Sequence, residues 1–458
     1  MTLQMNYIKL PSGLKGFNNH QTEIVQTVSG RELFLLNGEL TQEETDCICS
    51  HCKRVMHIHN TYEVNLNHLN IGQRLSSLRF SKLRYFCPSC RKTKMQAVPF
   101  QAEGHRITKE LFNYTRDLLA YGFTNKAVAF ITGLGKNTVK NIDMQRLQDK
   151  YTIDGKKLIK PEKQATFLGI DEFKLHNGHK YAVIIIDMET GHILWLAHGK
   201  KKASVYSFIE HVGLEWMDGV EAIACDMNSD FQEAFEDMCP HIQPVFDYFH
   251  IVKNFNDKVV GEIRKDEQRR LLAEGDVKGA QSLKKSRYIL TSSKRTLVKK
   301  DKEAEEEKII SKGSSLFTKE PVIRKSGYID RYEDLLSQNK LLFTLDLIKE
   351  KLAEAYRTKN EVEMANMISD IMDICTSTGN KHLRWFKRLL ENHFEGIIAH
   401  ATYDISAGKI EGINNKIKTL RRQGYGYPDD DYFFLKLFDA SRKTYVRNPI
   451  TNKIPQDL

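Results

Sequence analysis

Two short apolar runs that each end in an aspartate constrain the fold of this chain most strongly. They are Thr166–Asp171 and Val220–Asp226, and both are rich in apolar residues, as buried strands are. Two further strand-like runs lie between them, Lys180–Asp187 and His192–Ala197, and a hairpin-forming Glu-Thr-Gly separates these. Residues 203–217 then show helical spacing. The order predicts an α/β domain whose sheet holds carboxylates at strand ends, where a rigid scaffold leaves them open to a cation.

The pattern changes after these strands. Gln243–His250 predicts a fifth strand of a mixed sheet, and Ile251–Arg270 a long basic helix. Residues 263–400 are charged and have helical spacing, most clearly over Tyr332–Leu352 and Glu361–Leu390. We therefore expect an all-helical insertion that interrupts the α/β domain.

Charge and hydropathy narrow the class of protein. The 458 residues carry a formal net charge of +10, and the sequence pI is about 9.0, which makes nucleic acid a plausible partner. No apolar run is as long as a membrane span. The N-terminus lacks a basic segment followed by an apolar one, as a secretory signal would have. We expect a cytoplasmic protein without a membrane partner.

Five of the eight cysteines lie close together in the sequence, between Cys47 and Cys90. Two Cys-x-x-Cys pairs among them supply four thiolates, which suits a closed tetrahedral zinc site. The predicted Zn²⁺ is structural, because four cysteines leave no position open for a substrate. The ligands of this site are Cys49, Cys52, Cys87 and Cys90, with Cys47, His51, His57 and His59 as alternatives.

Residues 105–150 predict a helix-turn-helix. Thr108 is a suitable N-cap for a helix over Lys109–Tyr121. A short helix over Thr124–Ile131, a Gly-containing turn and a basic helix over Lys136–Ile142 follow. A plain helical hairpin is the alternative. In the DNA-binding interpretation, the second helix turns four residues toward a major groove: Lys136, Asn137, Thr138 and Lys140.

Near the C-terminus, a helical stretch combines one acid with amides and cations. Glu411, Asn414 or Asn415, Lys418 and Arg422 are three to four residues apart, so they share one helix face. Such a face suits a metal ion and an adjoining phosphate backbone. The candidate DNA contacts here are Asn415, Lys416, Lys418, Arg421 and Arg422; the alternative is a solvated surface.

Asp171, Asp226 and Glu411 together suit phosphoryl transfer by two Mg²⁺ (or Mn²⁺) ions, since these hard cations prefer carboxylates, waters and phosphate. Asp187 also ends a strand, and Asp230 and Asp247 are near Asp226 in the sequence, so the second acid has rivals. Asp187 lies at the opposite end of its antiparallel strand. Glu172 adjoins Asp171 on a strand and is expected to face away from it.

Four motifs resemble the DDE transposases of bacterial insertion sequences, most closely the ISL-three family. They are Gly169-Ile-Asp171-Glu-Phe, Cys225-Asp226-Met, Phe246-Asp-Tyr-Phe-His250 and Gly408-Lys-Ile-Glu411-Gly-Ile-Asn-Asn-Lys-Ile-Lys418. The resemblance covers nearly the whole chain. It implies an RNase H-like catalytic core with Asp171, Asp226 and Glu411 as the metal-binding triad, and the helical segment inserted between the last two. Asp247 and His250 match a family feature and are possible accessory residues that position DNA or a proton; alternatively, His250 is a packed histidine at a helix start.

A transposase of this type would recognise the terminal inverted repeats of its element with its zinc module and helix-turn-helix. It would hydrolyse the phosphodiester at the element's end, and the freed 3′-hydroxyl would then attack a phosphodiester of target DNA in a transesterification, without a covalent protein–DNA intermediate. Pairing two double-stranded ends calls for a homodimer or a larger synaptic complex in the bacterial cytoplasm, at the nucleoid when bound to DNA. The alternatives are a catalytically inactive DNA-binding regulator and a structure-specific nuclease on the same core.

These features divide the chain into successive parts. The expected parts are an N-terminal segment (1–44), a zinc-binding module (45–100), a helix-turn-helix (105–150), the first part of the core (160–262), the helical insertion (263–400), the second part of the core (401–445) and a tail (446–458).

Overall fold

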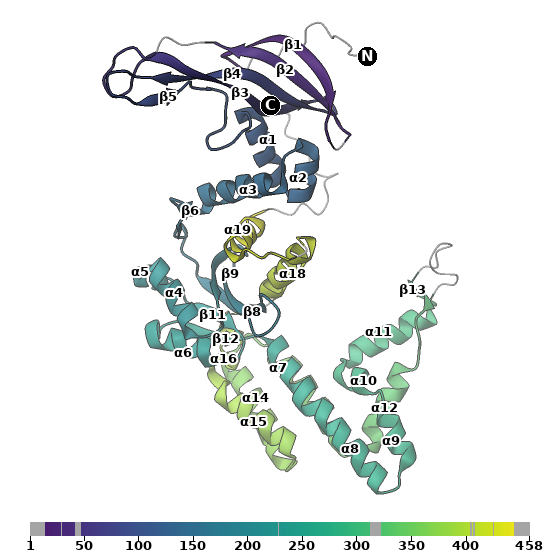
Figure 1. Ribbon diagram of the computed structural model, residues 1–458. Helices are drawn as coiled ribbons and strands as arrows, with labels where there is room; N and C mark the ends of the chain where they lie inside the picture. The colour runs from purple at the N-terminus through teal and green to yellow at the C-terminus, as the bar shows by residue number, and fades with distance from the viewer. Residues whose placement is uncertain are drawn as a thin grey trace, which may run out of the picture. The chain divides into compact units, whose positions relative to one another are not determined.

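The computed structural model describes residues 14–28, 30–41, 47–227, 229–311, 322–403, 405, 408–424 and 426–443, drawn in Figure 1. The expected tail, 446–458, lies outside these residues. The chain forms two compact units: residues 1–159 with 420–436, and residues 160–419 with 437–458. Helices α18 (Gly408–Gln423) and α19 (Asp430–Ser441) contribute residues to both units.

The first unit begins with a mixed sheet of order β1-β2-β4-β3, with β5 paired to β4. Its strands are β1 (Phe17–Gln26), β2 (Glu32–Leu40), β3 (His57–Ile71), β4 (Arg74–Phe86) and β5 (Thr93–Met95). Leu36, Leu66 and Leu78 are buried on one core with Phe17, Phe80 and Phe100. Because β2 pairs directly with β4, residues before 44 share a sheet with the predicted zinc module. The expected boundary at residue 44 therefore does not separate two folded parts.

Three helices follow, α1 (Lys109–Ala120), α2 (Asn125–Thr132) and α3 (Lys136–Tyr151). The Thr108 side chain caps α1, as predicted, and Thr124 caps α2 in the same way. Gly133, at φ 72°, ends α2 in the left-handed conformation that favours glycine. Helix α3 runs nine residues beyond the predicted end at Ile142, since Leu147 and Tyr151 continue its buried face. A small hairpin, β6 (Thr152–Ile153) and β7 (Lys157–Leu158), comes next.

A buried polar cluster joins α3 to the part of α19 that belongs to the same unit. Asp143 on α3 is fully buried and accepts hydrogen bonds from the Tyr432 hydroxyl (2.6 Å) and the Lys436 ammonium (2.8 Å). The Arg146 guanidinium lies 2.8 Å from the same carboxylate. Burial alone raises the pKa of Asp143, yet these two cations hold it below its usual range. The carboxylate is therefore ionised and satisfied.

The second unit contains a five-stranded mixed sheet, which confirms the predicted α/β sheet. Its strands are β8 (Phe167–Lys174), β9 (Tyr181–Asp187), β10 (Ile193–His198), β11 (Ala222–Cys225) and β12 (Gln243–Phe246), in the order β10-β9-β8-β11-β12. The pairs β10–β9 and β9–β8 are antiparallel, and β11 is parallel to both β8 and β12. Helices α4 (Lys202–Val212), α5 (Leu214–Met217) and α6 (Ser229–Met238) share a core with the sheet through Phe208, Met217 and Phe231.

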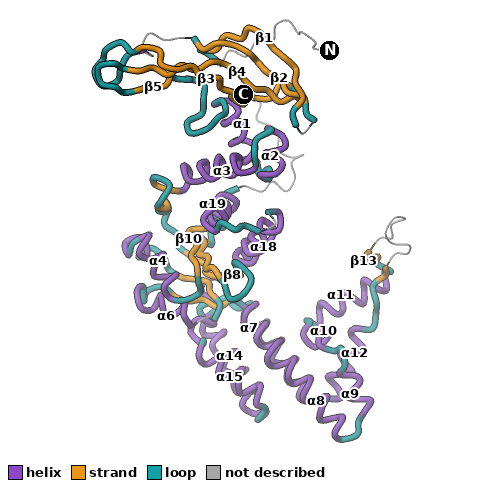
Figure 2. The backbone as a smooth tube through the Cα atoms, in the orientation of Figure 1, coloured by secondary structure: helices purple, strands orange, loops and turns teal. Residues whose placement is uncertain are grey.

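The segment after β12 is almost entirely helical (Figure 2). Helix α7 (Tyr248–Asn254), a π-helical turn (Phe255–Val260) and α8 (Gly261–Ala273) follow one another without a break. The remaining helices are α9 (Val277–Leu283), α10 (Arg287–Thr291), α11 (Lys294–Glu305), α12 (Tyr328–Gln338), α13 (Lys340–Ala355), α14 (Glu361–Ser377), α15 (Lys381–Asn392), α16 (Phe394–Ile398) and α17 (His400–Tyr403).

The structure corrects three details of the predicted insertion. It is not all-helical, because two short segments form an antiparallel strand pair, β13 (Ile309–Ser311) with β14 (Val322–Ile323). The predicted helix Tyr332–Leu352 is divided at Asn339, whose side chain caps α13. The predicted helix Glu361–Leu390 is divided where Asn380 caps α15. In the part of the chain that the structure describes, no helix has the length and apolar character needed to cross a membrane.

Candidate functional site

The pairing of two parallel strands brings the first two predicted acids together. Ala224 on β11 pairs with Gly169 on β8, and Asp226 and Asp171 each follow two residues later. Residues at equal offsets from a parallel pair lie at the same level on the same face of the sheet. The sequence predicted that Asp171 ends its strand. This is wrong, because β8 continues to Lys174 through its pairing with β9. Asp171 lies where β11 stops, so one edge of β8 is open beside it.

A close helix–strand contact brings the third acid to the same place. Ile410 on α18 packs against Gly169, where a Cβ atom would lie only 2.7 Å from Ile410 Cδ1. Only a residue without a side chain permits this approach. The Lys409 ammonium also donates a hydrogen bond to the Glu189 carbonyl oxygen (2.8 Å), just after β9. These contacts fix the start of α18 and with it the exposed Glu411.

Asp171, Asp226 and Glu411 line one pocket of about 550 Å³ in the second unit. The two possible accessory residues line it as well, and Asp247 accepts a hydrogen bond from the Phe249 N–H (2.7 Å), which caps α7. Further polar and aromatic side chains line the pocket. Glu172, Phe249 and Lys253 were not among the predicted site residues, and Asn414 is one of the two asparagines that the sequence left open.

The positions of Glu172 and Asn414 add to what the sequence predicted. Glu172 was expected to face away from Asp171, but it lines the same pocket as Asp171. Asn414, rather than Asn415, is the amide of the site: its Nδ2 donates to Asp171 Oδ2 at 2.6 Å, whereas Asn415 is exposed outside the pocket. Helical spacing from Glu411 left both asparagines open.

The electrostatics of the pocket suit a cation. Burial raises the pKa of Asp171, the Glu172 N–H opposes this, and the Asp226 charge raises it again. Burial likewise raises the pKa of Glu172, and the Lys200 ammonium opposes the shift. Glu172 Oε2 and Asn414 Oδ1 are buried oxygens that have no hydrogen-bond partner in the described residues. Carboxylate and amide oxygens in this state are suitable ligands for Mg²⁺ or Mn²⁺.

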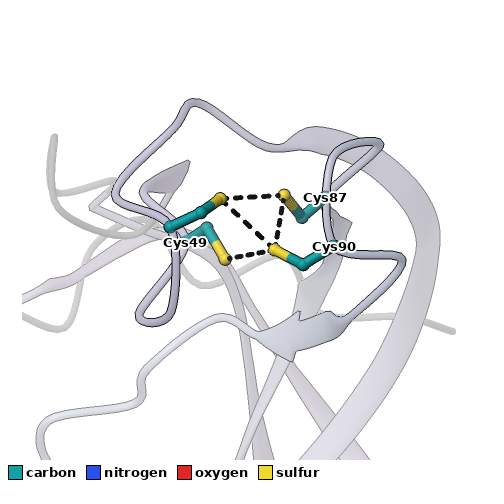
Figure 3. Close-up of side chains that lie close together, drawn as sticks. Cys49, Cys87 and Cys90 are labelled. Atoms are coloured by element: carbon teal, nitrogen blue, oxygen red, sulfur yellow. Dashed lines mark hydrogen bonds between the residues drawn. The ribbon is translucent and has the colours of Figure 1, made fainter.

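The four predicted cysteines lie together in the first unit, in a group that could hold a metal ion. Their sulfur atoms all lie within 4.8 Å of one another, and Figure 3 shows Cys49, Cys87 and Cys90 turned toward each other. The Sγ–Sγ distances are 3.5 Å from Cys49 to Cys90 and from Cys52 to Cys87. Zn–S bonds of about 2.3 Å in a tetrahedron place sulfurs roughly 3.8 Å apart. Among the described residues, these cysteines are the one group of three or more His, Cys, Asp or Glu residues whose ligand atoms lie this close together. The alternative ligands do not belong to the group; they are Cys47, His51, His57 and His59.

The two Cys-x-x-Cys turns have matching backbones that favour thiolates. In each, the first cysteine N–H donates to a carbonyl five residues on, Arg54 or Lys92, at 2.9 Å. The N–H groups of Cys52 and His51 lower the pKa of Cys49 from 9.0 to about 6, and the Cys90 N–H lowers the pKa of Cys87. The neighbouring thiols of Cys52 and Cys87 instead raise the pKa of Cys90. Metal-binding cysteines must be deprotonated, so the first cysteine of each turn is the one that the backbone prepares for an ion.

The predicted DNA contacts on α3 have different surroundings. Lys136 and Asn137 are exposed at the start of the helix, and Thr138 is half-buried. Lys140 instead forms an ion pair with Asp429 (2.7 Å) and lies over the Tyr432 ring. Its charge is therefore matched within the protein.

The predicted DNA contacts on α18 also differ from one another in their surroundings. Lys418 lines the acidic pocket. Lys416 donates a hydrogen bond to the Ala440 carbonyl oxygen of α19. Arg421 is half-buried and Arg422 is exposed in the last turn of the helix.

Comparisons with known proteins show the family to which the chain belongs. Residues 168–437, which include all three acids, match the model of the ISL-three family of DDE proteins, described as transposase. The transposase for insertion sequence element IS1001 of Bordetella parapertussis is 24% identical over 433 residues, 94% of this chain and 97% of that protein. Transposases for element IS1557 from two strains of Mycobacterium tuberculosis are 26% identical over 169 residues, 37% of this chain and 36% of theirs. The chain therefore belongs to the ISL-three family of DDE transposases, the DNA-cleaving enzymes of bacterial insertion sequences.

Proposed function

We propose that this transposase cuts DNA at the ends of its own insertion element and joins those ends to target DNA, with Asp171, Asp226 and Glu411 as its metal-binding triad. One observation carries the assignment: acids from three elements far apart in the sequence line a single pocket. The sheet order, with three antiparallel strands followed by two parallel ones, supports an RNase H-like core.

The donor atoms of the pocket fit a pair of divalent cations. When bound, two Mg²⁺ or Mn²⁺ ions supply activation of the attacking oxygen and stabilisation of the leaving oxygen. The protein holds the ligands for them: the Asn414 amide fixes one oxygen of Asp171, and Lys409 anchors the helix that carries Glu411. Lys418 in the same pocket is suited to a phosphate oxygen, and His250 to positioning DNA or a proton.

We further propose that the first unit recognises the terminal inverted repeats. Four thiolates held by two matching turns suit a structural Zn²⁺, and Lys136, Asn137 and Thr138 on α3 are available to a major groove. On α18, Asn415, Arg421 and Arg422 are candidate phosphate contacts, whereas Lys140 and Lys416 have partners within the protein. Since two ends must be joined, a homodimer or larger synaptic complex acts on the DNA in the bacterial cytoplasm.

A cleavage assay with the purified protein tests the triad. The substrate is a labelled duplex that carries the inverted repeat flanking the gene, incubated with Mg²⁺ or with EDTA. Glu411→Gln and Asp171→Asn are expected to lower the cleavage rate by more than about 100-fold, because even residues that only support metal ligands typically contribute 10- to 100-fold. Both variants should bind the repeat as the wild type does.

The matched control is Glu215→Gln, which makes the same change at an exposed helical position outside the pocket. It should cleave at the wild-type rate. Equal cleavage by Glu411→Gln and wild type would remove Glu411 from the triad. Specific binding without a nick in any metal would favour the inactive-regulator alternative, and junction cutting without end specificity would favour the nuclease.

A further inference from the structure

Helix α7 turns a large aromatic side chain toward solvent at the acidic pocket. Phe249 is 55% exposed and lines the pocket with the three acids. The rest of the helix start is firmly held: Ile251 is fully buried, Tyr248 packs on Tyr356 with ring centroids 5.2 Å apart, and the Phe249 N–H is bound by Asp247. The exposed ring therefore belongs to a fixed backbone, and water covers an apolar surface that a ligand would cover better.

The neighbours of this ring are suited to a nucleotide. The Phe249 ring meets His250 edge to face, with centroids 5.6 Å apart and planes at 83°, so one face of the phenyl ring is not used by that contact. One turn along α7, Lys253 is exposed and lines the same pocket. Neither Lys253 nor Lys418, across the pocket on α18, has an ion-pair partner among the described residues. An aromatic face beside a cation that has no ion-pair partner matches a base and its phosphate.

The size of the pocket determines which part of the DNA can enter. Its volume of about 550 Å³ is that of a small-molecule site, so it admits a nucleotide and not a whole duplex. A nucleotide whose phosphate reaches Asp171 and Asp226 can place an unstacked base against the Phe249 ring, which lines the same pocket. Enzymes that act on DNA in this way compensate an unstacked base with an aromatic side chain.

We propose that Phe249 and Lys253 form a nucleotide subsite in which the Phe249 ring stacks on the unstacked base next to the scissile phosphate. Lys253 contacts the phosphate that flanks this nucleotide. The inference rests on the proposed function and extends it to a residue that holds the substrate rather than the metal ions. Stacking does not depend strongly on base identity, so the subsite positions the cleaved strand and does not read its sequence.

A double-mutant cycle that combines a protein substitution with an abasic change in the DNA tests the subsite. Duplexes with one abasic nucleotide at each position around the cleavage site are cut by the wild type and by Phe249→Ala. Base stacking on an aromatic side chain is worth roughly 5- to 150-fold. The wild type should lose a factor in this range at one abasic position, Phe249→Ala should lose a similar factor on intact DNA, and the two losses should not multiply at that position. Phe249→Trp should retain cleavage.

Two controls make the result decisive. Phe343→Ala removes a phenyl ring of nearly the same exposure, 57%, from α13 outside the pocket, and it should cut every duplex as the wild type does. Lys253→Gln should weaken cleavage and reduce its salt dependence. Wild-type cleavage by Phe249→Ala on intact DNA, or losses that multiply at every position, would overturn the subsite and leave the triad intact. Failure of the proposed function has a different signature, since neither the wild type nor Glu411→Gln would then show Mg²⁺-dependent nicking.

Discussion

Replacing Gly169 with alanine is expected to move helix α18 and thereby separate Glu411 from Asp171. A Cβ atom at this position would lie 2.5 Å from Met188 Sδ and 2.7 Å from Ile410 Cδ1. Met188 has a flexible side chain that can turn aside. Ile410 is branched and 5% exposed, so it cannot do so without shifting the helix.

The size of the effect follows from these distances. Carbon atoms pack best at about 3.5–4.0 Å, so relief of the Ile410 contact requires a shift of roughly 1 Å. Overpacking of this kind costs about 1–3 kcal/mol, and loss of a strand glycine returns about 0.5–1 kcal/mol. The net loss of stability is therefore small. A misplacement of about 1 Å at a catalytic group can cost 100-fold in rate, so Gly169→Ala should lower cleavage far more than stability.

The assay combines urea unfolding with Mg²⁺-dependent cleavage of the element's end. The matched control is Gly412→Ala, since a Cβ there meets no described atom within 4 Å, and this variant should keep both properties. Adding Ile410→Val to Gly169→Ala removes the nearest carbon of the clash and should restore part of the cleavage rate. If Gly169→Ala cleaves as fast as the wild type, the glycine does not determine the distance between α18 and β8, and the reasoning is refuted.

Three further changes test other parts of the molecule. Cys87→Ser should release zinc and weaken end binding, while Cys47→Ser, outside the sulfur cluster, should retain the metal. In the wild type, the folded-state pKa of Cys49 is about 6, below its ordinary value of 9.0. Stabilisation by this thiolate is therefore complete above about pH 9, and the metal should be lost as the pH falls through about 6. Asp143→Asn should lower the free energy of unfolding by about 3–5 kcal/mol, because it leaves the buried Arg146 and the partly buried Lys436 without their anion; a change below about 1 kcal/mol in urea unfolding would contradict this. Lys136→Ala should weaken end binding and reduce the salt slope of log K by about one, whereas Lys140→Ala, which only breaks an ion pair with Asp429, should change that slope little.

Local chemistry explains what the sequence alone made predictable. Apolar runs form the five strands of the second unit, because short apolar runs bounded by turn residues are typical of buried strands. The Thr108 cap depends on a hydrogen bond over three residues. The paired cysteines are recognisable because two turns of fixed spacing can bring four sulfurs together. The four motifs identified the ISL-three family, and the family match confirms it.

Tertiary structure decided the contacts between segments distant in the sequence. Asp171 and Asp226 are neighbours because of the register of β8 and β11, which no single strand specifies. Asn414 rather than Asn415 joins the site because Ile410 packs on Gly169 and so fixes the rotation of α18. Lys140 and Lys416 lie in the same basic helical segments as Lys136 and Lys418. In the structure, however, Lys140 forms an ion pair with Asp429 and Lys416 donates a hydrogen bond to the Ala440 carbonyl oxygen. Helical spacing gives the faces of a helix, but only packing against another element decides which face meets the substrate.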